Sequence, residues 1–386
     1  LALQDLAMQV PPGGPALPLL VIEGVSGPLP ARKVWDHEVM TPARLTLQRN
    51  GSGTPDNEFV WPSTSPSIHC EVRVHGTSSA VEYGAPALHK LSYNLRLLRG
   101  SAPSGRLVVA FGRTWGAGHE FVLQGPQGDR SLIRNAFMYS LSGALGRAAP
   151  HFAFVELAIA DAGGPRRHVG VYMLVEKITS ARFGGGEDGG AQPLLLQYGR
   201  PAKAPMSWSV WPLGPSAFYI QEPKTPLLDG RRTTSESTTS TADTPSGLES
   251  FLGAALGLDG PDRMPELFMI HLDSFVDFWI MQELSANPDG FVFSTYLRRG
   301  GDGKLRAGPV WDFDIALGNC HAPFCCNGLD SGVDHWQFAH PNKGSPSHIA
   351  SFYRKLLVDR DVFRDVRTEF VARWALLRQG ELSDAS

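Results

Sequence analysis

Two aspartates with apolar neighbours stand out in the stretch "GPVWDFDIALGN", residues 308–319. Asp312 and Asp314 follow a short apolar run and enclose Phe313, and Trp311 precedes them. Burying a carboxylate is costly unless a positive group or several amide N–H groups lie against it. The pattern therefore predicts a metal ion, an arginine or a nest of amides beside these aspartates, and an ion pair with a core arginine is the alternative.

A third aspartate, Asp289, lies in a turn after the amphipathic stretch 272–287. Residues 290–311 are typical of a β-hairpin, which brings its two ends together, so we expect Asp289 and Asp312 to share one pocket. In kinase chemistry one aspartate orients the proton of the attacking hydroxyl, and a second, next to a phenylalanine, holds Mg²⁺ on the phosphates. The order of Asp289 and Asp312 matches that arrangement.

A nucleotide would also need donors for its phosphates. Lys90 lies where an early strand would carry the phosphate-binding lysine, and the turn 76–79 could offer backbone N–H groups from Ser78 and Ser79. Residues 172–177 could form the hinge against which an adenine packs. A strand lysine is more often simply solvated, and such a turn is more often only a turn. A glycosidase with paired carboxylates is another interpretation, but it leaves Lys90 and the turn unexplained.

Periodic apolar residues predict the elements that position these side chains. In residues 90–98, Leu91, Tyr93, Leu95 and Leu97 lie on one face of a predicted strand. The first half is predicted to contain strands at 17–24, 43–48, 68–79, 90–98, 151–161 and 168–178, and a helix within 129–146. The pattern predicts a strand-rich N-terminal lobe over residues 1–180.

The second half differs in composition. Residues 182–193 are rich in glycine, and the Ser/Thr-rich insertion from 231 to 247 is typical of a solvated, disordered segment. Helical periodicity follows at 247–257, 272–287 and 351–378. We therefore expect a helix-rich C-terminal lobe over residues 181–386, which carries the aspartates.

Composition narrows the class of protein. The chain has 386 residues, of which 42% are hydrophobic and 19% charged, with a net charge of −3. These hydrophobic and charged fractions are typical of globular domains. The slightly negative net charge gives no sign of a basic patch for nucleic acid. No apolar run is long enough to span a bilayer. The start, without Met or a charged leader, is typical of a processed product.

The four cysteines are Cys70, Cys320, Cys325 and Cys326, and three of them lie close to His321. Their spacing matches no common zinc pattern, and adjacent cysteines are hard to place around one tetrahedral ion. The sequence leaves three interpretations of these cysteines, namely one or two disulfides, free thiols or a metal cluster. Disulfides would agree with a secreted or cell-surface location.

Four blocks of the sequence resemble the CotH kinase family, the spore-coat-protein-H type of atypical protein kinase. They are "VRVHGTSSA" with "HKLSYNLRL", then "HVGVYMLVEKI", "LDSFVDFWIMQELSANPDGFVFSTYLRR" and "GPVWDFDIALGN". The tail "FYRKLLVDRDVFRDVRTEFVARWALLR" is also similar to the usual end of the family. The resemblance runs from about residue 17 to residue 378 and is interrupted by the insertion.

This resemblance implies an α+β, bilobal protein-kinase-like fold, ATP with Mg²⁺ or Mn²⁺, and phosphoryl transfer to Ser or Thr of secreted or surface proteins by a monomer. By position it makes Asp289 the catalytic base and Asp312 a metal ligand. Lys90 becomes the phosphate-contacting lysine, with Ser78 and Ser79 in the phosphate-side turn. Glu176 would lie at the nucleotide-side strand or hinge.

Two positions depart from the expected pattern. Asp314 lies where other members often have Asn, so it is interpreted as an auxiliary ligand. Ser294 stands five residues after Asp289, where a kinase catalytic loop has Asn, and its neutral hydroxyl is a weaker metal ligand. The alternative function is a pseudokinase or surface adhesin that binds a partner without catalysis.

Overall fold

The structure is a computed structural model that describes residues 17–24, 40–49, 59–76, 90–101, 105–112, 114–125, 128–183, 194–199, 210–213, 216–222, 245–258, 264–319, 336, 348–358, 360–380 and 382–383. The chain divides into two compact units. The first contains Leu1–Leu132 and His151–Lys177, and the second contains Ile133–Pro150 and Ile178–Ser386. Both units are therefore built from discontinuous segments.

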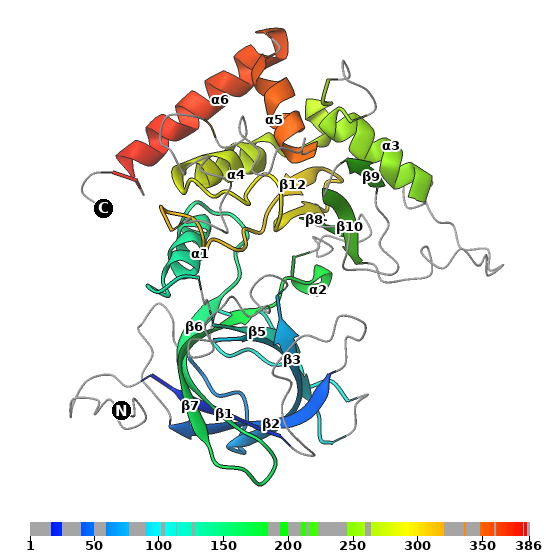
Figure 1. The fold of residues 1–386 in the computed structure, drawn as a ribbon. Coiled ribbons are helices and arrows are strands. Elements are labelled where there is room, and N and C mark those ends of the chain that lie inside the picture. Colours follow the sequence, from blue (N-terminus) through cyan, green and yellow to red (C-terminus); the bar gives the residue numbers. More distant parts are fainter. Residues whose placement is uncertain are drawn as a thin grey trace, which may run out of the picture. The chain divides into compact units, whose positions relative to one another are not determined.

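The first unit is a closed β-barrel with the strand order β1-β2-β3-β4-β5-β7-β6 (Figure 1). Neighbouring strands pair antiparallel except β1 and β6, which pair in parallel from Leu19 and Glu156 to Glu23 and Ala160 and close the barrel. The strands are β1 (Leu19–Gly24), β2 (Thr41–Arg49), β3 (Ser67–His75), β4 (Ser92–Leu98), β5 (Glu120–Gln124), β6 (Phe152–Ala160) and β7 (Arg167–Glu176).

Alternating side chains fill the barrel. Tyr93, Leu95 and Leu97 of β4 lie in its core, which confirms the face predicted for that strand. On β3 every second residue is buried. Each fully buried aliphatic side chain contributes about 1.5–3 kcal/mol. The short strand β5 is the one barrel strand that periodicity did not predict.

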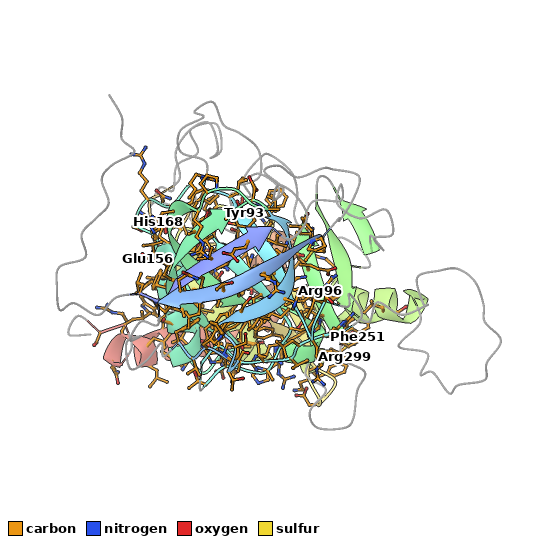
Figure 2. All side chains as sticks on the ribbon, turned by 90° about the horizontal axis from the view of Figure 1, so that it is seen from below. Tyr93, Arg96, Glu156, His168, Phe251 and Arg299 are labelled. Atoms are coloured by element: carbon orange, nitrogen blue, oxygen red, sulfur yellow. The ribbon has the colours of Figure 1, made fainter. Side chains whose placement is uncertain are left out.

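Charged residues cover the outside of the barrel. Arg96 of β4 pairs with Glu71 at 3.2 Å and with Glu120 at 3.3 Å. Glu156 of β6 and His168 of β7, both labelled in Figure 2, approach within 3.4 Å. Cross-strand contacts of this kind stabilise the register of a sheet.

The second unit combines a five-stranded sheet with helices. The sheet order is β12-β11-β8-β10-β9. Its strands are β8 (Leu194–Gly199), β9 (Val210–Leu213), β10 (Ser216–Glu222), β11 (Thr295–Arg299) and β12 (Leu305–Ala307). The helices are α1 (Arg134–Ala144), α2 (Ser180–Phe183), α3 (Pro245–Leu256), α4 (Leu272–Leu284), α5 (His348–Val358) and α6 (Arg360–Gln379), with a 3₁₀ turn at Leu267–Met269.

The predicted fold class, α+β with a bilobal protein-kinase-like arrangement and a helix-rich C-terminal lobe, is wrong. The first unit is a closed barrel, and the second carries its own sheet, so the described elements are mostly β. Periodicity reports local structure, so it could not reveal that β1 pairs with the distant β6. Strands β8 to β10 also lie in segments for which the sequence pattern predicts no element.

A buried aspartate joins three segments of the second unit. Asp277 of α4 is fully buried and accepts hydrogen bonds from Arg147, which follows α1, at 2.5 Å and from Arg373 of α6 at 2.6 Å. Tyr353 of α5 donates to the Phe275 carbonyl at 2.9 Å. These contacts hold helix α4 close to α5 and α6 (Figure 1). The turn that carries Asp289 follows directly after this fixed helix.

Candidate active site

The turn after α4 is organised by Asn287, which is only 2% exposed. Its Oδ1 accepts from the backbone N–H of Asp289 at 3.2 Å, and its Nδ2 donates to Gln282 Oε1 at 3.0 Å. The same Nδ2 lies 3.5 Å from the backbone carbonyl of Asp312. The amide of Asn287 therefore links the backbones of the two aspartates.

Glycine is required beside Asp289. A Cβ on Gly290 would lie 2.1 Å from Gln282 Oε1, so a larger residue would displace the side chain that holds Asn287. The Asp289 carbonyl accepts from Val292 at 3.0 Å and from Phe293 at 2.7 Å. These bonds fix the backbone of Asp289, and one oxygen of its carboxylate is buried.

The predicted hairpin is confirmed and leads from Asp289 to Asp312. Strands β11 and β12 pair antiparallel, with Leu297 opposite Ala307. At the open end of the hairpin, Ser294 Oγ donates to Asp312 Oδ2 at 2.8 Å. The structure thus brings together two of the predicted metal-binding residues, Ser294 and Asp312.

Both of these residues have left-handed backbone conformations, with φ of 53° at Ser294 and 70° at Asp312. Such conformations cost on the order of 1–3 kcal/mol for residues other than glycine and occur often at functional sites. The surrounding contacts must therefore hold them in place.

Helix α1 supplies those contacts. Asn135 Oδ1 accepts from the backbone N–H of Phe313 at 2.6 Å, and Arg134 Nε donates to the Ala316 carbonyl at 3.1 Å. The ring of Tyr139 stacks on Trp311 with centroids 5.8 Å apart. Asn135 is not among the residues predicted from the sequence, although a polar side chain on the buried face of a predicted helix was a usable signal.

The negative charge of Asp312 also acts on Tyr296 of β11. Burial raises the pKa of the Tyr296 hydroxyl, and the carboxylate of Asp312 raises that pKa further. The phenol therefore stays protonated at neutral pH. A neutral hydroxyl donor thus lies within the electrostatic field of Asp312.

The oxygens of Asp312 and Ser294 fit a small hard cation. Mg²⁺ prefers oxygen ligands, keeps several waters, and is usually held by one or two carboxylates together with substrate phosphates. Within the described ranges no three His, Cys, Asp or Glu side chains form a metal cluster. The carbonyl of Asp314, the predicted auxiliary ligand, accepts from Asn319 Nδ2 at 2.5 Å.

Lys90 belongs to the barrel unit. Its Nζ donates to the Val171 carbonyl of β7 and lies 4.9 Å from the ring centre of Tyr172. Burial lowers the pKa of the Lys90 ammonium. The Tyr172 hydroxyl donates to the Leu91 carbonyl at 2.9 Å, which ties the backbone next to Lys90 to β7.

Glu176 ends β7 and is 3% exposed. Its Oε1 accepts from Gly116 N at 2.9 Å, and its Oε2 accepts from His151 N at 3.0 Å. The His151 ring lies 2.9 Å away through Nδ1 and stacks on Trp115. The Glu176 carboxylate therefore joins two connecting segments of the barrel, the one between β4 and β5 that contains Gly116 and the one that leads into β6 at His151.

The structure does not bring Lys90 and Glu176 together. Lys90 contacts β7 at Val171, and the five residues from there to Glu176 span about 17 Å at the usual rise of a strand. The other predicted nucleotide-side residues, Ser78 and Ser79, lie outside the described residues, as does the insertion up to residue 244.

The cysteines are only partly described. Cys70 is a free thiol in the barrel core, and its burial, followed by the charge of Glu71, raises its pKa to about 12. Cys320, Cys325 and Cys326 lie outside the described residues, so the disulfide interpretation stays a prediction for them. Within the described part of the chain, no helix has both the length and the apolar character to cross a membrane.

Comparison with protein families identifies the chain. The family model described as CotH kinase protein matches residues 72–185 and 268–386, more than half of the chain. The chain belongs to the CotH kinase family. The matched segments contain Lys90 and Glu176 of the barrel unit and Asp289, Ser294 and Asp312 of the second unit. No curated protein matches the sequence. The predicted CotH resemblance is thereby confirmed.

Proposed function

We propose that this CotH family member is an ATP- and divalent-metal-dependent protein kinase that phosphorylates Ser or Thr of secreted or cell-surface proteins. The observation that carries the proposal is the arrangement around Asn287. Its amide joins the backbones of Asp289 and Asp312, and Ser294 adds a hydroxyl oxygen at the carboxylate of Asp312. One candidate base and one candidate metal ligand are thus held by the same side chain.

The proposed reaction needs a base at the acceptor hydroxyl. The hydroxyl oxygen of the acceptor forms a bond to the γ-phosphorus, the bond from that phosphorus to the β–γ bridging oxygen breaks, and ADP leaves. Asp289 accepts the hydroxyl proton, because its turn is fixed by Asn287 and Gly290. The products are a phosphorylated Ser or Thr and ADP.

Asp312 and Ser294 would hold the divalent cation, with Asp314 as an auxiliary ligand. When bound, such a cation neutralises the charge on the β- and γ-phosphates. Lys90 is the proposed phosphate contact, and its lowered pKa still leaves a donor in the N–H groups of its amine. Ser78, Ser79 and Glu176 complete the proposed nucleotide side, in which Glu176 acts by holding the barrel connections.

A pseudokinase that binds a partner without catalysis is the second candidate. The observation that favours it is the hydrogen bond from Ser294 to Asp312, because the hydroxyl occupies one carboxylate oxygen and is a poor ligand beside an amide carbonyl or carboxylate. The two candidates differ in turnover and share the fold.

Binding and transfer of labelled ATP test the proposal. We would measure ATP affinity by calorimetry with Mg²⁺, with Mn²⁺ and with EDTA, and then transfer of the γ-phosphoryl to a Ser-rich protein. Asp312→Asn should lower metal-dependent affinity by about 10–100-fold, because the amide lacks the negative charge. Asp273→Asn is the matched control, since Asp273 is an exposed aspartate at the start of α4.

If the parent transfers the γ-phosphoryl group and Asp312→Asn does not, the result would support a kinase. Metal-dependent ATP binding without transfer by the parent would favour the pseudokinase. Equal ATP binding by the parent and Asp312→Asn, with both proteins folded, would contradict the assignment of the metal site.

A further inference from the structure

The β11–β12 hairpin carries an unusual excess of positive charge. Arg298, Arg299, Lys304 and Arg306 lie within it, whereas Asp302 is its one acidic residue. Arg298 and Arg306 are direct partners across the ladder. Like charges directly opposite each other destabilise a strand pair, so this arrangement favours an anion at the surface of the hairpin.

Arg306 is already neutralised and fixed. Its Nη1 and Nη2 donate to the two oxygens of Asp302 at 2.6 and 2.9 Å, and Nη1 also lies 3.3 Å from the Lys304 carbonyl. These bonds lower the pKa of Asp302 to about 2. A Cβ on Gly300 would lie 1.8 Å from Arg306 Nη1, so a larger residue would displace the guanidinium from this position.

Arg298 is not neutralised in this way. It is half-buried, and its Nε is buried without a hydrogen-bond acceptor among the described residues. Burial lowers the pKa of Arg298, and the positive charges of Arg306 and Arg147 lower that pKa further, whereas Asp302 raises it. Arg147 is itself bound to Asp277. Arg306 and Arg147 thus each have a carboxylate partner, whereas Arg298 has none among the described residues.

We propose that Arg298 binds a phosphate monoester on the protein acceptor, so that the kinase prefers a segment that already carries a phosphoryl group. This inference rests on the proposed function. A phosphorylated Ser or Thr carries about −1.5 to −2 charges at pH 7 and presents three acceptor oxygens. An arginine binds such a group through two parallel N–H donors, and because the Nε of Arg298 is buried, its two terminal nitrogens would supply them.

The position of Arg298 predicts a spacing. It lies four residues after Ser294, which is the residue that contacts Asp312, and four residues of strand span about 13 Å. An extended peptide covers the same distance with about four residues. The phosphate on the acceptor should therefore stand about four residues from the hydroxyl that is phosphorylated.

Binding is measured first, without ATP or metal, so that the result is independent of catalysis. The probes are a Ser-rich peptide with one phosphoserine, the same peptide unphosphorylated, and inorganic phosphate, each titrated into the full chain by calorimetry. The phosphopeptide should bind at least about tenfold more tightly than either other probe. Arg298→Gln should abolish that preference, and Arg130→Gln, which removes an exposed arginine of the barrel unit, should keep it.

Three results would overturn the inference. The first is equal binding of the phosphorylated and unphosphorylated peptides. The second is tighter binding of inorganic phosphate than of the phosphopeptide, since the acceptor would then not be the source of the anion. The third is displacement of the phosphopeptide by ATP in the absence of metal, since Arg298 would then belong to the nucleotide site.

Transfer assays separate this inference from the proposed function. Peptides with the phosphoserine two, four and six residues from the acceptor are compared, and the four-residue spacing should be phosphorylated fastest by the parent alone. Phosphopeptide binding without any transfer would support the anion site and reject the kinase. Transfer without any preference for phosphorylated peptides, unchanged in Arg298→Gln, would reject the anion site and keep the kinase.

Discussion

Ser294 donates a hydrogen bond to the carboxylate of Asp312 over 2.8 Å. Both residues have a positive φ, and the contacts from Asn135 and Asn287 hold the loop of Asp312 in that conformation. The hydroxyl orients the carboxylate, and in the proposed function it would compete with a cation for one of its oxygens. If Asp312 holds a metal as proposed, the side chain at position 294 would therefore affect how tightly it binds.

Replacement of residues 289 and 294 should have opposite effects. Asp289→Asn should lower phosphoryl transfer by about 10²–10⁴-fold, because the amide cannot accept the hydroxyl proton. Ser294→Asn should maintain or raise transfer, because Asn tolerates a φ of 53° better than Ser and offers a carbonyl oxygen to the cation. Radiolabel transfer from ATP measures both. Parental activity in Asp289→Asn would disprove the proposed mechanism.

Loss of the Lys90 amine should weaken ATP binding. Lys90→Met keeps the apolar stem that packs near Tyr172 and removes the donor, so we expect about a tenfold higher Kd for ATP with a similar melting temperature. Arg96→Gln is the comparison, since Arg96 is the second cation of this region and is paired with Glu71 and Glu120. If only Arg96→Gln weakened ATP binding, Arg96 would replace Lys90 as the phosphate contact.

Asn135→Ala should loosen the loop of Asp312. The buried N–H of Phe313 would lose its acceptor, at a cost of about 1–3 kcal/mol of unfolding free energy, and metal-dependent ATP affinity should fall. Ser142→Ala is the control on the same helix, because the buried Ser142 makes only a 3.4 Å contact with the Ala148 carbonyl. Denaturant unfolding and ATP titration report the two effects. Equal ATP affinity in both variants would show that Asn135 does not position the loop.

Asp277→Asn should be among the most destabilising changes. Asp277 is fully buried between Arg147 and Arg373, and removal of its charge leaves both guanidinium groups without their carboxylate. Breaking a buried ion pair by loss of one partner costs about 3–5 kcal/mol, and we expect about 3 here because both arginines are partly exposed. Urea unfolding measures this loss of unfolding free energy. A loss similar to that of exposed Asp273→Asn would mean that the cluster contributes little.

Cys70 should resist alkylation in the folded protein at pH 8. Its pKa rises from 9.0 to about 12 on burial, so folding keeps the thiol protonated. Because the pKa is raised in the folded state, this group stabilises the fold fully below pH 9 and loses that contribution as the pH rises toward 12. Mass spectrometry after iodoacetamide treatment, with and without urea, tests the first point. Rapid labelling of native Cys70 would show that the barrel core is open.

Local signals in the sequence predicted much of the secondary structure and the hairpin. Alternation placed Tyr93, Leu95 and Leu97 in the core, and the apolar flanks of Asp312 predicted a confined carboxylate. The partners of these groups were harder to predict. Asn135 bonds to Phe313 across 178 residues of sequence, and the parallel pairing of β1 and β6 also joins distant segments. Such pairings depend on tertiary packing, which the local patterns do not encode.

The contacts of Glu176 were also not predicted from the sequence. Its position near the predicted hinge suggested a nucleotide contact, whereas its carboxylate accepts the backbone N–H groups of Gly116 and His151. Backbone N–H donors of this kind satisfy a buried carboxylate. The sequence shows the carboxylate but not the two connections that it binds.

Helix α1 interrupts the barrel sequence but belongs to the second unit, which determines the order in which its contacts can form during synthesis. Residues 133–150 leave the barrel unit after β5 and belong to the second unit, and the chain then returns for β6 and β7. The hydrogen bond from the Phe313 N–H to Asn135 cannot form until Phe313 has been synthesised, 178 residues after Asn135. At common elongation rates this takes roughly 10–35 seconds. Until then the apolar face of α1 is exposed in the nascent chain. Chaperone binding to ribosome-bound chains that end shortly after β7 should therefore concentrate on this helix.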